Sequence, residues 1–157
     1  MDLTFNVKRL TETAQLPTQA NPSDAGWDLY ADEDVEIWPG ETKLISTGVS
    51  LEIPDGYVGL IWDRSSMGVK GIHRHAGVID SGYRGEIKVC LHNSKHSDVN
   101  RILSHTVDKE KVGVLTMSRG DRIAQILFQE APVFKLVETD VLVETARGAG
   151  GFGSSGK

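Results

Sequence analysis

The sequence predicts an all-β sandwich or barrel, and three observations carry that prediction. Apolar residues alternate around Val7, Leu51 and Val89 with the two-residue period of half-buried strands. Clusters of Asn, Asp, Pro, Ser and Gly separate these stretches at intervals typical of such folds. Patterns with a helical period are scarce. We therefore expect short strands joined by tight turns.

The elements follow in chain order. Strands are expected at residues 3–7, 49–53 and 87–91, and turns at 21–23, 38–40, 54–56 and 80–82. The stretch GVIDSGYRGEIKV predicts a β-hairpin in which Asp80 enters the turn and Tyr83 leaves it. Two short helices are possible: a turn or two after Ser65, and a stretch that Asp98 could cap.

The length of 157 residues, 39% of them hydrophobic, indicates one domain. We expect a body at residues 1–145 and a flexible arm at 146–157, because five of the last eleven residues are glycine. Composition alone favours a disordered linker there. Residues 93–118 are polar and charge-mixed and predict an inserted loop, either solvated or bearing a partner site.

Charge and cysteine content narrow the function. A net charge of -5 argues against a nucleic-acid surface, so a polyphosphate ligand would need local arginines such as Arg64, Arg122 and Arg147. No apolar run is long enough for a membrane span, and the first residues lack a signal peptide's apolar block, which favours the cytoplasm. Cys90 is the only cysteine, so no intrachain disulfide can form.

Several short motifs could carry chemistry. The segment DAGWDLYADED places Asp24 and Asp28 where carboxylates could hold Mg²⁺ through water. In WDRSSMGVKG, Arg64 lies beside two serines, a composition suited to phosphate. In GDRIAQILF, Gln125 follows Arg122 where a strand leaves a turn. Each motif alone also has an ordinary structural explanation as a capped turn, a solvated surface or a strand start.

These three segments, the Asp80 hairpin and the GFGSS tail together resemble the five motifs of the trimeric dUTP pyrophosphatases (dUTPases). In chain order the hairpin is the third motif and GDRIAQILF the fourth. The resemblance implies a jelly-roll β-barrel that assembles as a homotrimer with shared active sites. It also implies hydrolysis of dUTP to dUMP and pyrophosphate with Mg²⁺, by water attack on the α-phosphorus. That reaction limits uracil incorporation into DNA and supplies dUMP for dTMP synthesis.

The resemblance also assigns roles to residues. Asp80 would orient and deprotonate the attacking water, and Asp28 would contact Mg²⁺ through water. Tyr83 would pack against the sugar and reject a ribose hydroxyl. The other substrate-binding positions implied are Arg64, Ser65, Ser66, Gly77, Ile79, Gln125, Arg147, Phe152, Gly153, Ser154 and Ser155, the last five on an arm that closes over the site.

The sequence departs from the family pattern in three places. Asp63 stands where a proline usually precedes the motif-two arginine, and Met67-Gly68 replaces the commoner leucine and alanine. Arg74 lies three residues before Gly77, where some members carry an asparagine that helps hold uracil, so the base contacts at that point are open.

Three alternatives remain at this stage. A related dCTP deaminase would need a glutamate where Cys90 stands. A regulatory binding protein could engage a partner through residues 93–118, in host cytoplasm if the chain is viral. His73, His75, Cys90 and His92 also raise a less favoured zinc hypothesis.

Overall fold

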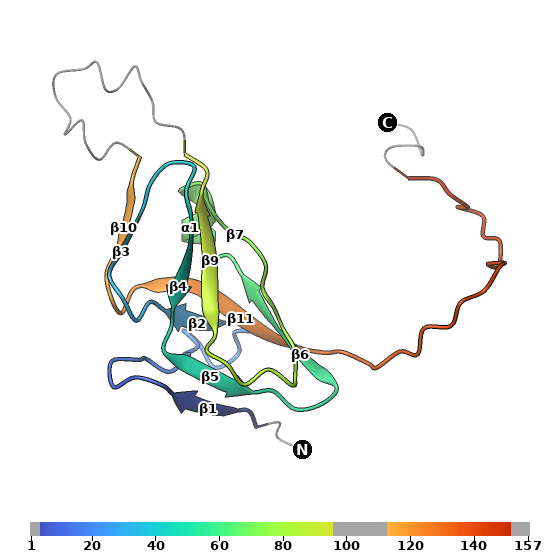
Figure 1. The fold of residues 1–157 in the computed structure, drawn as a ribbon, viewed down its shortest axis with the longest axis horizontal. Coiled ribbons are helices and arrows are strands. Elements are labelled where there is room, and N and C mark those ends of the chain that lie inside the picture. Colours follow the sequence, from blue (N-terminus) through green and yellow to red (C-terminus); the bar gives the residue numbers. More distant parts are fainter. Residues whose placement is uncertain (1–3, 96–112, 152–157) are drawn as a thin grey trace, which may run out of the picture.

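The computed structural model describes residues 4–95 and 113–151 and confirms the all-β prediction. Figure 1 shows the strands gathered into a compact body, with the chain after β11 running away from it. The elements in chain order are β1 (Asn6–Arg9), β2 (Trp27–Tyr30), β3 (Val35–Ile37), β4 (Thr42–Ser46), β5 (Val49–Glu52), β6 (Tyr57–Trp62), α1 (Ser65–Val69), β7 (Ile72–Arg74), β8 (Val78–Ile79), β9 (Lys88–Asn93), β10 (Leu115–Met117) and β11 (Arg122–Glu130).

The strands form antiparallel sheets that enclose one apolar core. One sheet has the order β2-β11-β6-β8 and another the order β4-β9-β7, while β1 pairs with β5 and β10 with β3. In β9, Val89 and Leu91 are buried while Lys88 is exposed, which is the alternation that the sequence predicts. The fully buried side chains are mainly isoleucine, leucine and valine from the inner faces of these strands.

Most of the predicted local structure is confirmed. The turn at 54–56 closes with a hydrogen bond from Tyr57 N to Pro54 O at 3.2 Å, and that at 38–40 with one from Glu41 N to Trp38 O at 2.9 Å. The helix after Ser65 is α1. The helix that Asp98 could cap lies outside the described residues.

The predicted hairpin is wrong in its pairing. The turn is present, since Tyr83 N donates to Asp80 O at 3.0 Å. However, β8 pairs with β6, and β9 pairs with β4 and β7. The physical reason is that the chain after the turn bonds to β5 and the residues before it: Ser50 Oγ donates to Arg84 O at 2.7 Å, and Gly48 N donates to Glu86 Oε1 at 2.9 Å.

The structure also places the ends of the body. β9 runs through Asn93, whose buried amide donates to Ile37 O and Gly113 O at 2.9 Å each, so this residue belongs to the body. β10 lies within the stretch that the sequence assigns to the inserted loop, and residues 96–112 lie outside the description. At the other end, β11 stops at Glu130, and residues 131–145 run with the arm instead of the body (Figure 1).

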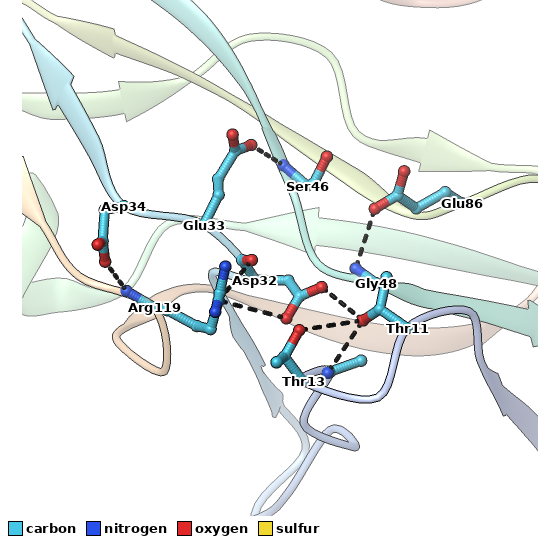
Figure 2. Close-up of polar contacts among 10 residues, drawn as sticks. Thr11, Thr13, Asp32, Glu33, Asp34, Ser46, Gly48, Glu86 and Arg119 are labelled. Carbon is cyan, nitrogen blue, oxygen red and sulfur yellow. Dashed lines mark hydrogen bonds and ion pairs between the residues drawn. The ribbon is translucent and has the colours of Figure 1, made fainter.

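A buried carboxylate fastens the N-terminal segment to the strands (Figure 2). Asp32 is 9% exposed, and its Oδ2 accepts a hydrogen bond from Thr11 Oγ1 at 2.5 Å. Arg119 donates from Nε to Asp32 O at 2.9 Å and from its main-chain N to Asp34 Oδ1 at 2.8 Å. Burial acts to raise the pKa of Asp32, but the bonds from Thr11 and Thr13 and the Arg119 charge outweigh it and leave the pKa below its ordinary value.

No helix in the described part of the chain has the length and apolar character that a membrane span requires.

Candidate active site

A polar cleft of about 390 Å³ opens where β2, β11 and the start of α1 meet. Strand register creates it: Gln125 on β11 lies opposite Asp28 on β2 on one side and opposite Trp62 on β6 on the other. Arg64 follows β6 by two residues and therefore reaches the same place. The cleft is lined by Ala20, Asp24, Gly26, Asp28, Arg64, Ser65, Ser66, Arg122 and Gln125.

Asp28 is the electrostatic centre of this cleft. Its Oδ1 lies 2.9 Å from Arg64 Nε, and its Oδ2 accepts from Arg122 Nη1 at 3.1 Å. Arg64 also donates from Nη1 to Arg122 O at 3.1 Å. Two guanidinium groups are thus held side by side by one carboxylate, which leaves their other N–H groups available to an anion.

Gln125 is fixed beside the arginines. Its Nε2 donates to Asp63 O at 2.9 Å. The space that its amide occupies exists because residue 26 is glycine: a Cβ at Gly26 would collide with Gln125 Oε1. Gly26 lies within the acidic segment DAGWDLYADED, whose sequence gives no sign that it makes room for Gln125. Only the packing reveals this role.

Ser65 and Ser66 lie at the first turn of α1. Arg64 precedes the helix with extended backbone, and its carbonyl accepts from Met67 N at 2.9 Å and Gly68 N at 3.0 Å. Ser65 and Ser66 are exposed on the cleft. The main-chain N–H groups of a first helical turn have no carbonyl of their own helix to bind. The serines and arginines can therefore donate to the same oxyanion.

The predicted hairpin residues lie in a second pocket of about 280 Å³. It is lined by Leu44, Val78, Ile79, Asp80, Tyr83, Glu86 and Lys88. Tyr83 is 45% exposed, and its Oη donates to Glu86 O at 3.0 Å. Gly77 accepts from Ile61 N at 2.8 Å with φ 141°, a conformation that favours glycine.

Arm residues form a third group. Arg147 is exposed, and its Nε donates to Gly150 O at 3.0 Å. Phe152, Gly153, Ser154 and Ser155 lie outside the described residues. The structure of one chain therefore brings together the predicted metal contact Asp28 and the predicted phosphate contacts Arg64, Ser65, Ser66 and Gln125, while Asp80 and Tyr83 line another pocket and Arg147 lines neither.

Arg74, one of the departures from the family pattern, contacts an aromatic ring and a main-chain carbonyl. The Arg74 guanidinium lies 4.9 Å from the centroid of the Trp62 ring, and its Nη1 donates to Ala76 O at 2.7 Å. Two of the residues in the zinc hypothesis are neighbours: the ring centroids of His75 and His92 lie 5.1 Å apart. Within residues 4–95 and 113–151, however, no group of three or more His, Cys, Asp or Glu side chains is arranged to hold a metal ion.

The fit to Mg²⁺ follows from the donors in the cleft. Both Asp28 oxygens are engaged by arginine, so this carboxylate suits a hydrated ion held through water better than a directly bound one. Mg²⁺ keeps several waters and commonly takes its remaining ligands from substrate phosphates. The residues present therefore fit a metal that arrives with a polyphosphate.

Comparisons with known proteins identify the family. The dUTPase family model matches residues 12–102 and 110–156. The chain is 43% identical to a deoxyuridine 5'-triphosphate nucleotidohydrolase of Mycolicibacterium gilvum, covering 99% of this chain and 97% of that protein. It is 42% identical to the same enzyme of Nocardia farcinica, covering 96% of this chain and 84% of that protein.

Solved structures that are similar to this chain are also dUTPases. A dUTPase mutant of Staphylococcus bacteriophage 80alpha with dUpNHpp has a TM-score of 0.86 and 31% identity, covering 98% of this chain and 99% of that one. A dUTPase mutant of phage phi11 of S. aureus, described as coordinating a structural Mg(II) ion, has a TM-score of 0.77 and 28% identity, covering 88% and 98%. The chain therefore belongs to the dUTPase family.

Proposed function

We propose that this chain hydrolyses dUTP to dUMP and pyrophosphate, the reaction of its family, and that the polar cleft holds the triphosphate. The convergence of Arg64, Arg122, Gln125 and the two serines on one cleft is the observation that carries this proposal. Guanidinium, amide and hydroxyl donors together match a chain of phosphate oxygens. The reaction would limit uracil in DNA and supply dUMP for dTMP synthesis, and we place it in the cytoplasm, or in host cytoplasm if the chain is viral.

Asp28 would hold the Mg²⁺ of the substrate complex through water. When bound, Mg²⁺ would neutralise part of the negative charge on the phosphate oxygens. The chain's own part is to orient the Asp28 carboxylate, which the Arg64 and Arg122 contacts do. The same two arginines remain available to the phosphate oxygens.

Asp80 would act as the base that orients and deprotonates the attacking water. It is exposed on the turn after β8, where a carboxylate can take a proton from water bound beside it. Tyr83, on the same pocket, would lie against C2′ of the sugar and exclude UTP. The main chain of Gly77 and Ile79 would meet the uracil, so that bases with a different donor pattern leave buried polar groups unpaired.

The separation of the three residue groups supports a homotrimer with shared sites. Among residues 4–95 and 113–151, the cleft and the Asp80 pocket share no lining residue and Arg147 lines neither, so a complete site would need parts from other copies. Residues 131–145, which lead to the arm, also expose an apolar series that a second copy would cover: Val133, Phe134, Leu136, Val137, Val141, Leu142 and Val143 are 74–94% exposed. Arg147, Phe152, Gly153, Ser154 and Ser155 would then close over a neighbouring site.

The alternatives gain no specific support. Cys90 on β9 offers a thiol where a dCTP deaminase would need its glutamate. A partner site on residues 93–118 stays a prediction, because most of that segment lies outside the described residues.

Product analysis tests the proposal directly. The protein is incubated with Mg²⁺ and dUTP, dCTP, UTP or dTTP in parallel, and the nucleotides are separated by chromatography. We expect dUMP from dUTP alone. Deamination of dCTP, or inertness toward all four nucleotides, would contradict it. Sedimentation equilibrium tests the trimer independently, since a monomer mass would refute the shared site.

A further inference from the structure

Asp63, the residue that replaces the usual proline, contacts three residues on two strands, one on β11 and two on β7. Its main-chain O accepts from Gln125 Nε2 at 2.9 Å. Its Oδ1 accepts from the main-chain N of Arg74 at 2.8 Å, and its Oδ2 lies 3.5 Å from His73 Nδ1. A proline at this position could offer only the main-chain carbonyl, so the bond to Arg74 N depends on the aspartate side chain.

The first bond of Asp63 connects it to the polar cleft. Gln125 lines that cleft, and Asp63 is the residue directly before Arg64. The backbone of Asp63 therefore sets the position of the Gln125 amide, which bonds to it, and of the Arg64 Cα, which follows it in the chain. A shift of this backbone would move two of the groups proposed to hold phosphate.

The second bond connects Asp63 to the chain that leads to Asp80. Arg74 ends β7, and its guanidinium donates to the carbonyl of Ala76, which has the unusual φ of 64°. Gly77 follows and accepts from Ile61 N on β6. Asp63 thus anchors the first residue of a short, conformationally demanding segment that ends at β8.

Burial indicates which contact of the side chain has the greater effect. The Asp63 side chain is 34% exposed and that of His73 is 51% exposed, so their contact is screened by solvent and contributes little to stability. The bond to the Arg74 N–H is shorter and joins a main-chain donor, which would otherwise lose its acceptor.

We propose that Asp63 is a positioning residue for dUTP hydrolysis: by accepting the Arg74 N–H while its carbonyl holds Gln125, it holds in place both the polar cleft and the segment that carries Asp80. This inference rests on the proposed function. It requires an acceptor at Oδ1 and does not require the negative charge.

The test compares Asp63→Ala, which removes the acceptor, with Asp63→Asn, which keeps it without the charge. Asp55→Ala, in the exposed turn at 54–56, is the matched control. Each protein is assayed for kcat and KM with dUTP and for the Kd of the non-hydrolysable α,β-imido-dUTP by calorimetry, and its melting temperature is recorded.

We expect Asp63→Ala to lower kcat/KM about tenfold, mostly through KM and with a matching rise in Kd, because lost ground-state contacts raise KM. Asp63→Asn and Asp55→Ala should stay within about twofold of wild type, the range expected where no hydrogen bond is lost. If Asp63→Ala fails to fold, Asp63→Glu replaces it, since it keeps the charge but displaces the acceptor by one methylene.

Two results would overturn the inference: Asp63→Ala as active as wild type, or Asp63→Asn as impaired as Asp63→Ala. Wild-type protein that binds the analogue but does not hydrolyse dUTP would refute the proposed function, and the ratio of the variants' Kd values would still decide the role of Asp63.

Discussion

Replacing Gly77 with alanine places a methyl group against the backbone of a central strand. An ideal Cβ at this position would lie 2.9 Å from Ile61 O and 3.2 Å from Ile61 Cβ. Ile61 is 3% exposed and paired with Ile126 on β11, so it cannot retreat without disturbing the four-stranded sheet. The backbone of residue 77 also has φ 141°, which an L side chain rarely adopts.

Two costs combine in this variant. A side chain in a sparsely populated backbone region costs about 1–3 kcal/mol. Forcing an extra methyl into a packed site costs about 1–3 kcal/mol more. We expect Gly77→Ala to lose about 2–6 kcal/mol of unfolding free energy, which for a chain of this size lowers the melting temperature by about 4–24 °C.

Urea and thermal unfolding, followed by circular dichroism at equal protein concentrations, provide the assay. Equal concentrations matter because an oligomer's stability depends on them. Gly82→Ala is the matched control: it lies five residues on, without a positive φ and with no atom within 4 Å of the added Cβ, and should change stability by less than about 0.5 kcal/mol. A Gly77→Ala protein as stable as Gly82→Ala would refute the steric reasoning.

Three further predictions concern the base, the arm and the buried acid. Asp80→Asn should bind α,β-imido-dUTP as wild type does and lose at least about a hundredfold in kcat, since general-base catalysis contributes that much; normal turnover would remove Asp80 from this role. Truncation after Thr145 should leave the melting temperature unchanged and abolish most dUTP turnover, and a fully active truncated protein would show that the glycine-rich end is only a linker. Asp32→Ala should destabilise the fold by about 1–3 kcal/mol at pH 7 because Thr11 loses a buried partner. Since the folded-state pKa of Asp32 lies below its ordinary value of 3.8, its stabilisation is present above that pH and is lost as the pH falls through the folded value, so urea midpoints of Asp32→Ala and wild type should converge in acid.

Local structure was readable from the sequence wherever short-range chemistry decides it. The turns at 38–40 and 54–56 follow from Pro and Gly, and the burial of Val89 and Leu91 follows from their alternation with polar residues. The gathering of Arg64, Ser65 and Gln125 on one cleft was also predictable, because their residue types and order match the family motifs.

The pairing of strands was not readable in the same way. The stretch around Asp80 has the local chemistry of a hairpin, yet β8 bonds to β6, and Ser50 and Gly48 bind the chain after the turn. A turn sequence fixes the direction of the chain only over four residues, whereas partner choice depends on which distant backbone groups are left to satisfy.

The sequence by itself determined the all-β class, the family and the candidate site residues, because strand periodicity, turn chemistry and motif order are properties of the chain. Only the tertiary structure decided that Asp28 is held between Arg64 and Arg122, that Gly26 makes room for Gln125, and that Asp63 bonds to Arg74. These contacts join residues from 11 to 99 positions apart or depend on the absence of a single methyl group. No local pattern records such distances; the packing of β2, β6, β7 and β11 around one core sets them.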